Sequence, residues 1–148
     1  MNRNLELITI KDPKSPISES YRILRTNIQF HPLMKNKCNF VTSSTPGEGK
    51  STTSANLAIT MAQNGAKTIL VDCDLRKPNV HKLFKLSNIR GLSNLLIEDN
   101  SIDGVIQQSS VENLHILTSG VKPPNPSELL SSRKMNNFIE TSKNTMII

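Results

Sequence analysis

The stretch that most constrains this chain is the run SSTPGEGKST at positions 43–52. It follows the phosphate-binding pattern G-x-x-x-x-G-K-[ST], with Ser44 where the first glycine usually stands. The largely apolar residues 38–42 before it predict a strand, and residues 53–62 after it, with apolar side chains recurring on one face, predict a helix. Because strand, glycine loop and helix are the context that such a loop requires, the sequence favours a phosphate site over a chance turn of Gly, Ser and Thr.

The residue types of this loop suit a polyphosphate ligand. Gly47 and Gly49 lack a Cβ, so the backbone can turn tightly and bring its amides, together with the positive end of the following helix, close to an anion. Lys50 places a positive charge on the β- and γ-phosphates, and the Ser51 hydroxyl suits Mg²⁺, which keeps several waters and few protein ligands. The predicted nucleotide-binding residues are Pro46, Gly47, Glu48, Gly49, Lys50, Ser51 and Thr52.

An acidic segment follows the next predicted strand. Residues 67–72 form an apolar run typical of a parallel strand, and the span from Phe40 to Asp72 suits a β-α-β unit with a right-handed crossover. We therefore expect Asp72 and Asp74 at the carboxyl end of a strand beside the loop strand, where ligands bind in open α/β sheets. Carboxylates there can hold Mg²⁺, directly or through water, or accept a proton from an attacking hydroxyl. The alternative for Asp72 is a helix or turn cap.

The N-terminal part predicts a short extended segment and one long helix. Residues 5–10 alternate apolar and polar side chains, which favours a strand or an extended arm. Ser15 and Pro16 are typical of an N-cap and a first helical position, and His31-Pro32 ends the helix near Phe30. The apolar stripe of this helix is Ile17, Tyr21, Leu24 and Ile28, and three charged residues on its other faces are Glu19, Arg22 and Arg25.

The remaining segments predict short elements and one basic stretch. The expected elements are helices at 91–97 and 102–106, a strand at 114–118, a loop at 119–126 that could line the nucleotide site, a helix at 128–141 capped by Asn125 or Ser127, and an apolar strand from 145. Between Leu75 and Ile97 every charged residue is basic: Arg76, Lys77, Lys82, Lys85 and Arg90. This stretch is either a solvated helix face or a docking surface for an acidic segment or a phosphate.

Composition narrows the class of protein. A length of 148 residues suits one domain, and the formal net charge of +6 is compatible with a nucleotide, a nucleic acid or an acidic membrane face. Cys38 and Cys73 make no disulfide framework and favour a reducing cytoplasm. His31, His81 and His115 have no zinc-type spacing and are interpreted as structural. No signal peptide or membrane-spanning segment is predicted, so any membrane role is expected to go through a partner.

Four stretches together resemble the bacterial tyrosine kinases of capsular and exopolysaccharide synthesis, over nearly the whole chain. They are the E-x-x-R-x-x-R helix from Glu19, the Walker A loop at 43–52, the Walker A′ segment ILVDCDLRKP at 69–78, and the runs LTSG and PPNPSELL within 117–130. The resemblance implies a P-loop NTPase of the α/β class, with a parallel sheet flanked by helices on both faces. It implies oligomerisation through Glu19, Arg22 and Arg25. It also implies catalysis by Lys50, Asp72 and Asp74, with ATP as substrate and Mg²⁺ held by Ser51 and Asp72.

The resemblance further implies how the chain is divided. Residues 1–148 are expected to be one kinase domain lacking its C-terminal part, with an N-terminal arm and oligomerisation helix at 1–35 and a nucleotide-binding core at 38–148. In the family a strand like 145–148 continues into Walker B residues, and a C-terminal tyrosine cluster follows. The single tyrosine of this chain, Tyr21, is expected to be packed rather than phosphorylated. We therefore expect weak or no kinase activity from this chain alone.

The function that the resemblance implies is an ATP-dependent, autophosphorylating protein-tyrosine kinase. It would form a homo-oligomeric ring, act on protein tyrosines, and be held at the cytoplasmic face of the membrane by a transmembrane chain-length regulator that activates it. One alternative is a partitioning or division-site ATPase, whose signature lysine is absent at Thr45. The other is a catalytically silent interaction module that binds nucleotide weakly. A nucleic acid is not the expected partner, because no aromatic platform accompanies the basic stretch.

Overall fold

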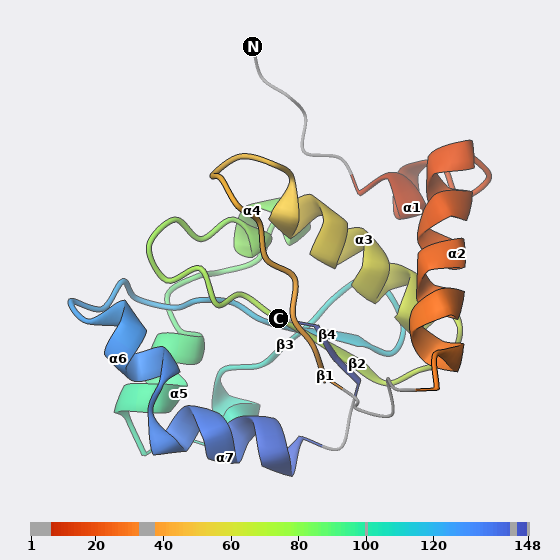
Figure 1. Cartoon of the computed structure of the whole chain (residues 1–148). Coiled ribbons are helices and arrows are strands. Elements are labelled where there is room, and N and C mark those ends of the chain that lie inside the picture. Colours follow the sequence, from red (N-terminus) through yellow and green to blue (C-terminus); the bar gives the residue numbers. More distant parts are fainter. Residues whose placement is uncertain (1–6, 33–37, 100, 143–144, 148) are drawn as a thin grey trace.

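The computed structural model describes residues 7–32, 38–99, 101–142 and 145–147, which are arranged around one sheet (Figure 1). Its strands are β1 (Cys38–Asn39), β2 (Thr68–Val71), β3 (Gln107–Gln108), β4 (Leu114–Leu117) and β5 (Thr145–Ile147). They lie in the order β1-β5-β2-β4-β3. The first four in this order are parallel, as the sequence predicts, and β3 is an antiparallel edge strand that the sequence did not predict.

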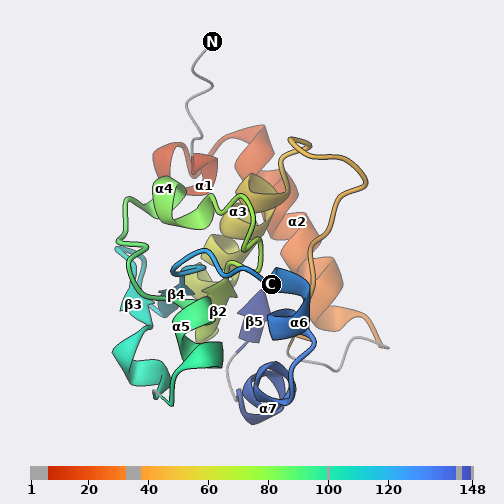
Figure 2. The same ribbon diagram turned by 90° about the vertical axis from the view of Figure 1, so that its left-hand side faces the viewer.

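Helices cover both faces of this sheet, which confirms the predicted α/β class (Figures 1 and 2). On one side lie α1 (Ile8–Lys11), α2 (Pro16–Phe30), α3 (Lys50–Gln63) and α4 (Val80–Phe84). On the other side lie α5 (Leu92–Ile97), α6 (Pro126–Leu130) and α7 (Arg133–Thr141), and the 3-10 turn η1 (Ile102–Gly104) leads into β3. Within the described residues, none of the helices is both long and apolar enough to cross a membrane.

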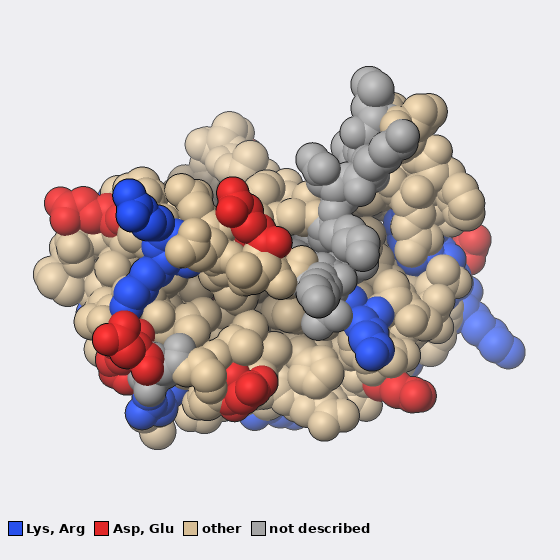
Figure 3. Space-filling view, turned by 90° about the horizontal axis from the view of Figure 1, so that it is seen from below, with Lys and Arg blue, Asp and Glu red and all other residues tan. Residues whose placement is uncertain are grey.

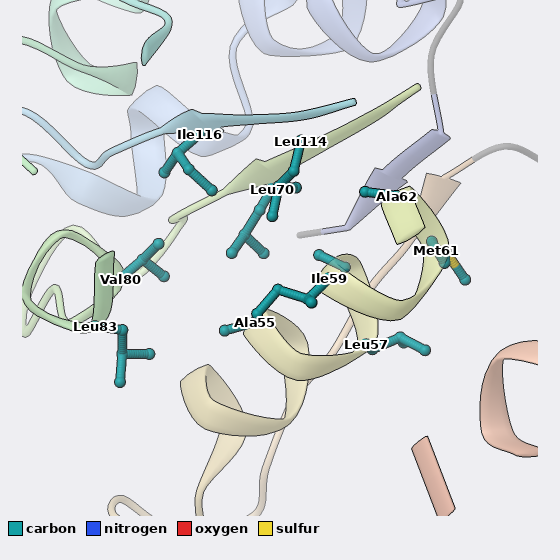
Figure 4. Close-up of a cluster of buried hydrophobic side chains, with 11 residues drawn as sticks. Ala55, Leu57, Ile59, Met61, Ala62, Leu70, Val80, Leu83, Leu114 and Ile116 are labelled. Atoms are coloured by element: carbon teal, nitrogen blue, oxygen red, sulfur yellow. The ribbon is translucent and has the colours of Figure 1, made fainter. Parts of the chain in front are cut away.

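Alternation along β2 divides the core into two halves. Leu70 belongs to the cluster beneath α3, together with Ile59 and Ile116 (Figure 4). Its neighbours Ile69 and Val71 belong to the cluster on the side of α5 and α7. Because successive strand residues point to opposite faces, a strand buried on both faces needs helices above and below it.

The helix α2 begins and ends where the sequence predicts. Ser15 is its N-cap, and the Ser15 hydroxyl accepts a hydrogen bond from the Ser18 amide at 3.1 Å. Pro16 occupies the first turn, and the C-cap is His31. A local capping signal was therefore enough to define this helix.

The segment before α2 differs from the prediction, because residues 8–11 form the helix α1 rather than a strand. Thr9 is fully buried there, and both its amide and its hydroxyl donate to the side-chain oxygen of Asn56 on α3, at 3.1 and 2.7 Å. This tertiary contact is 47 residues away in sequence, so no local pattern reports it. Residues 5 and 6 of the predicted strand lie outside the described part of the chain.

The face that α2 buries is rotated from the predicted apolar stripe. Ile17 and Leu24 of that stripe remain 58% and 39% exposed, whereas Tyr21 is half-buried and Ile28 packs against the core cluster beneath α3. The buried face contains Ser18 instead, whose hydroxyl donates at 2.7 Å to a carbonyl of the loop between α1 and α2. On the same side, Arg25 Nη1 donates to the carbonyl of Thr60 on α3 at 3.0 Å. Polar contacts with two neighbouring elements therefore orient the helix.

The position of the acidic segment in the sheet also differs from the prediction. β5 lies between β1 and β2, so Asp72 does not follow a strand that neighbours the loop strand. The register shows this directly, since Met146 pairs with Cys38 on one side and with Ile69 on the other. β1 ends at Asn39, so residues 40–42 are not part of the strand. One extra strand adds only about 4.8 Å of lateral spacing, which a long side chain can cross.

The predicted helix at 128–141 is broken into α6 and α7 at two serines. The Ser131 hydroxyl donates back to the carbonyl of Ser127 at 3.0 Å, and Ser132 is the N-cap of α7, accepting from the Met135 amide at 3.2 Å. Asn125 is the N-cap residue of α6 without a side-chain bond to the helix backbone. Serine side chains that bond to nearby backbone compete with a continuous helix, which explains the break.

Candidate nucleotide site

The phosphate loop is an exposed turn whose shape depends on two left-handed glycines. Gly47 has φ +83° and Gly49 has φ +91°, and Gly49 is the N-cap of α3. A Cβ at either position would meet no atom within 4 Å. The backbone angle, and not crowding, is therefore what favours glycine here. The turn leads directly into the first amides of a 14-residue helix, which is the geometry for binding an anion.

Glu48 holds the start of the loop through the backbone. Its carboxylate accepts hydrogen bonds from the amides of Ser44 and Thr45 at 3.1 and 3.3 Å. The bonds from Thr45, followed by those from Ser44, lower the pKa of this exposed carboxyl from its ordinary value. Glu48 was predicted to bind nucleotide, but in this structure it contacts the loop itself.

Lys50 and Asp74 form an ion pair across the site. Lys50 Nζ lies 3.0 Å from Asp74 Oδ2, and the two side chains are 34% and 29% exposed. The other carboxylate oxygen of Asp74 accepts the Lys77 amide at 2.9 Å. Partial burial tends to raise the pKa of Asp74, but the Lys77 amide and the Lys50 ammonium together lower it below its ordinary value. Asp74 is therefore a charged acceptor that faces the loop lysine.

Asp72 is buried and accepts three backbone hydrogen bonds. Asp74 donates its amide to Oδ1 at 3.1 Å, and Asn79 and Val80 donate theirs to Oδ2 at 3.1 and 3.0 Å. Only 4% of the residue is exposed, and burial raises the pKa of this carboxyl although the three amide bonds oppose the rise. Asp72 therefore caps the start of α4, as the alternative interpretation of this residue predicted. Its Oδ1 atom accepts one of these bonds and can accept one more.

Two cavities meet at these residues. One, of about 560 Å³, is lined by the phosphate loop together with Lys50, Ser51, Asp74, Arg76, Lys77 and Asn79. The other, of about 450 Å³, is lined by Phe40, Val41, Asp72, Asp74, Pro126, Ser127 and Leu130 among others. Lys50, Ser51, Asp74 and Arg76 line both. A cavity of about 570 Å³ between α5 and α7 contains none of the predicted site residues.

The basic stretch does not act as one surface. Arg76 and Lys77 line the phosphate cavity, and Arg90 is paired with Glu98 at 2.8 Å. Lys82 and Lys85 are exposed on and just after α4. On the α7 face, acidic and basic side chains of the described residues lie interspersed (Figure 3). The sequence analysis placed Arg76 within the Walker A′ resemblance and within the basic stretch that could dock a phosphate, but it gave Arg76 no individual role at the nucleotide site.

The sequence analysis suggested that the loop at 119–126 could line the nucleotide site, but Ser119 and Gly120, together with Thr118, pack against residues 87–94. The amides of Leu92 and Ser93 donate to the carbonyls of Thr118 and Ser119, at 2.7 and 2.9 Å. A Cβ at Gly91 would overlap the Thr118 carbonyl oxygen, so the approach requires glycine. Of the longer predicted loop and the helix after it, Pro126, Ser127 and Leu130 reach the second cavity.

The three residues predicted for oligomerisation have partners inside the chain. Arg22 Nε pairs with Glu19 at 2.8 Å within α2, and Arg25 donates to α3 as described above. The Nε atom of Arg25 is buried without a hydrogen-bond partner in the described structure. Tyr21 on the same helix is half-buried. A role for these residues between subunits stays a prediction.

The residues present fit a magnesium ion with few protein ligands. Ser51 and Asp72 both line the second cavity, and they offer a hydroxyl and a carboxylate oxygen. Among the described residues, no group of three or more His, Cys, Asp or Glu side chains could hold a metal. A site with few protein ligands suits Mg²⁺, which retains several waters and uses substrate phosphates as ligands.

Known proteins match both the sequence and the fold. The family model of the AAA domain matches residues 39–145. The tyrosine-protein kinase YwqD of Bacillus subtilis is 50% identical over 136 residues, which are 91% of this chain and 56% of YwqD. The tyrosine-protein kinase CpsD of Streptococcus agalactiae is 40% identical over 142 residues, 95% of this chain and 62% of CpsD. The chain therefore spans a little over half the length of these curated relatives.

Several solved structures have a fold similar to that of this chain. The crystal structure of the chimerical protein CapA2B2 has a TM-score of 0.91 at 46% identity, covering 96% of this chain and 64% of that chain. The kinase domain of Escherichia coli tyrosine kinase ETK has a TM-score of 0.89 at 33% identity. The match covers 100% of this chain and 59% of the ETK chain. The septum site-determining protein MinD of Pyrococcus horikoshii, complexed with Mg-ADP, is more distant, with a TM-score of 0.60 at 26% identity. This match covers 74% of this chain and 46% of the MinD chain. The chain belongs to the AAA-domain family, and the curated relatives that it matches at 50% and 40% identity are tyrosine-protein kinases.

Proposed function

We propose that this chain forms the nucleotide-binding part of an ATP-dependent, autophosphorylating protein-tyrosine kinase that regulates capsular or exopolysaccharide synthesis. The observation that supports this most directly is that Lys50, Ser51, Asp72 and Asp74, from two distant segments of the sequence, line one cavity. The names of the relatives, which are tyrosine-protein kinases, support the same reaction. The activity, substrates and partners of the whole protein are part of this proposal.

The proposed chemistry follows from the arrangement of these groups. The amides of residues 46–52 and the start of α3 bind the phosphates of ATP, and the Lys50 ammonium neutralises charge on the β- and γ-phosphates. Ser51 and Asp72 would hold Mg²⁺, which when bound would draw charge from the transferred phosphoryl group. Asp74 accepts the proton of the attacking tyrosine hydroxyl.

The Lys50–Asp74 ion pair has a place in this proposal. An arriving polyphosphate attracts Lys50 more strongly than one carboxylate does, because it carries several charges and lies at a helix N-terminus. Movement of Lys50 to the phosphates leaves Asp74 free to approach an acceptor hydroxyl. The partly exposed pair is weak enough to exchange partners in this way.

The proposal divides the chain into an arm and helix at 1–35, which associate with other subunits to form a ring, and a nucleotide-binding core at 38–148. Glu19, Arg22 and Arg25 would take part in that association. A transmembrane chain-length regulator would act as the activating partner and hold the protein at the cytoplasmic face of the membrane. The exposure of Ile17, Ile23 and Leu24 on α2 is compatible with a subunit contact there.

The test measures nucleotide binding and phosphotransfer in the same preparation. The wild-type chain is expected to bind a fluorescent ATP analogue with Mg²⁺ and to transfer phosphate to a tyrosine-rich peptide, if only slowly, and Lys50→Met should abolish both. Lys67→Met, an exposed lysine outside both cavities, is the matched control. Because weak or no transfer is expected of this chain alone, the silent interaction module would be favoured by binding without transfer in a chain extended to the length of its curated relatives. ATP hydrolysis stimulated by DNA would favour a partitioning ATPase. Full transfer by Lys50→Met would contradict the proposed site.

A further inference from the structure

Arg76 stands where the two cavities of the site join. It lines the phosphate cavity together with the loop, and it lines the second cavity together with Asp72 and Ser127. The three other residues that line both cavities already have proposed roles in binding phosphate, metal or the acceptor proton. Arg76 is the remaining cation at this junction.

The contacts of Arg76 leave its charge available to a ligand. Its Nη2 atom donates to the Ser127 hydroxyl at 3.4 Å, which is a long and therefore weak hydrogen bond. The nearest acidic residue in sequence, Asp74, is already engaged on both oxygens by Lys50 and by the Lys77 amide. Among the ion pairs of the described residues, none includes Arg76, and its side chain is exposed.

We propose that Arg76 binds the terminal phosphate of a nucleoside triphosphate and thereby determines the preference of the site for triphosphate over diphosphate. This inference rests on the proposed function. The loop amides and Lys50 take the phosphates nearest the start of α3, so the end of the polyphosphate chain extends toward the junction that Arg76 lines. A planar guanidinium with several fixed donors matches two oxygens of a terminal phosphate, and only a weak bond to Ser127 has to be given up.

Lys77 provides an internal comparison, because it carries the same charge one residue further on. It lines the phosphate cavity but not the second one. Its amide, and not its ammonium, is bonded to Asp74. Lys77 therefore adds positive potential to the whole polyphosphate, whereas Arg76 is positioned for its far end.

The experiment compares ATP and ADP binding in the full 148-residue chain. Fluorescent ATP and ADP analogues are titrated with Mg²⁺ at constant ionic strength, and inorganic tripolyphosphate and pyrophosphate are used as competitors without a base. We expect Arg76→Ala to weaken binding of ATP and tripolyphosphate by about ten- to one-hundredfold, and of ADP and pyrophosphate by less than about threefold. Lys77→Ala should weaken all four ligands by similar factors, and Lys82→Ala, on α4 outside both cavities, should change none.

The outcomes separate this inference from the proposed function. If the wild type binds neither nucleotide, the proposed function itself is wrong, and there is no terminal phosphate for Arg76 to bind. If the wild type binds ATP and Arg76→Ala weakens ATP and ADP by the same factor, only the role of Arg76 is overturned. Because Arg76 is exposed, its variant should melt at the wild-type temperature. Arg76→Lys keeps the charge but not the planar guanidinium with its fixed donors. Compared with Arg76→Ala, it should therefore recover only part of the preference for ATP.

Discussion

The phosphate loop at 43–49 and the loop at 118–120 both carry Ser, Thr and left-handed Gly near the carboxyl ends of parallel strands, yet the surroundings of their glycines differ. In the phosphate loop, Gly47 and Gly49 have positive φ and open space around them. In the second loop, Thr118 and Ser119 are buried. Gly120 also has a positive φ, +78°, but a Cβ there, or on the adjacent Gly91, would overlap atoms across the contact. One loop is open to solvent, and the other is a packing contact.

This difference teaches that composition alone does not separate a binding loop from a structural one. The residues of the open loop are largely exposed, and its first amides, of Ser44 and Thr45, are bonded to Glu48 within the loop. The closed loop instead forms hydrogen bonds with residues 87–94. Substitutions in the closed loop should therefore change stability, and substitutions in the open loop should change binding. The following predictions test that separation, from the largest expected effect to the smallest.

Gly91→Ala should destabilise the chain most, by on the order of 3 kcal/mol. Gly91 has φ −172°, which alanine tolerates, so the whole effect comes from the overlap of the added Cβ with the Thr118 carbonyl oxygen. Chemical denaturation gives the change in unfolding free energy. Gly104→Ala is the control, because a Cβ there meets no atom within 4 Å. Equal stability of the two variants would show that the closed loop is not tightly packed.

Asp72→Ala should reduce the free energy of unfolding by about 1–3 kcal/mol, because buried amides lose their acceptor. The amides are those of Asp74, Asn79 and Val80. Thermal unfolding monitored by circular dichroism measures the loss, with the exposed Asp103→Ala as control. An unchanged melting temperature would mean that Asp72 has no structural role and serves only the ligand.

Gly49→Ala should separate binding from stability. The left-handed backbone at φ +91° costs alanine about 1–2 kcal/mol, and the distorted loop should lose ATP affinity by at least about tenfold. Gly65→Ala is a matched control at the far end of α3, because Gly65 has φ +88° and a Cβ there would meet no atom within 4 Å. Both variants should lose similar stability, and only Gly49→Ala should lose binding. Equal affinities would contradict the assignment of the loop.

Asp74→Asn should weaken the dependence of stability on acid pH. The pKa of Asp74 is lowered in the folded chain, so its ionised form contributes stability above the unfolded pKa, and this contribution is lost as the pH falls through the folded value. The variant should lose less stability than the wild type as the solution is acidified through the aspartate range. Urea unfolding at a series of pH values measures this, and Asp99→Asn, nearly fully exposed, is the control. Parallel curves for wild type and Asp74→Asn would contradict the ion pair with Lys50.

Glu19→Ala should have the smallest effect on the single chain, about 0.2–0.5 kcal/mol, because it removes one exposed pair within α2. A subunit role would appear differently, as a lower mass in light scattering with little change in melting. Arg22→Ala should behave in the same way. Arg25→Ala is a poorer probe of assembly, since it also removes the hydrogen bond to α3. An unchanged mass for both Glu19→Ala and Arg22→Ala would restrict these residues to local pairing.

The sequence by itself determined the elements whose signals are local. The loop residues 43–52, the Ser15 cap of α2, and the apolar runs of β2 and β4 act through backbone angles, short hydrogen bonds and side-chain periodicity over a few positions. The convergence of Lys50 with the acidic segment was also predictable, because the ends of parallel strands meet at one edge of a sheet.

Only the tertiary structure decided the features that depend on contacts between distant segments. The helix α1 depends on Asn56 of α3, and the orientation of α2 depends on Thr60 of the same helix. The insertion of β5 between β1 and β2 is a matter of strand pairing, which no local pattern encodes. The loop at 118–120 is closed by contacts such as that of Gly120 with Asn88, which is 32 positions away in the sequence. Arg76 likewise contacts Ser127, which is 51 positions away, at the junction of the two cavities. Those contacts gain their free energy from burial and hydrogen bonding across the fold, and so they appear only once the fold has formed.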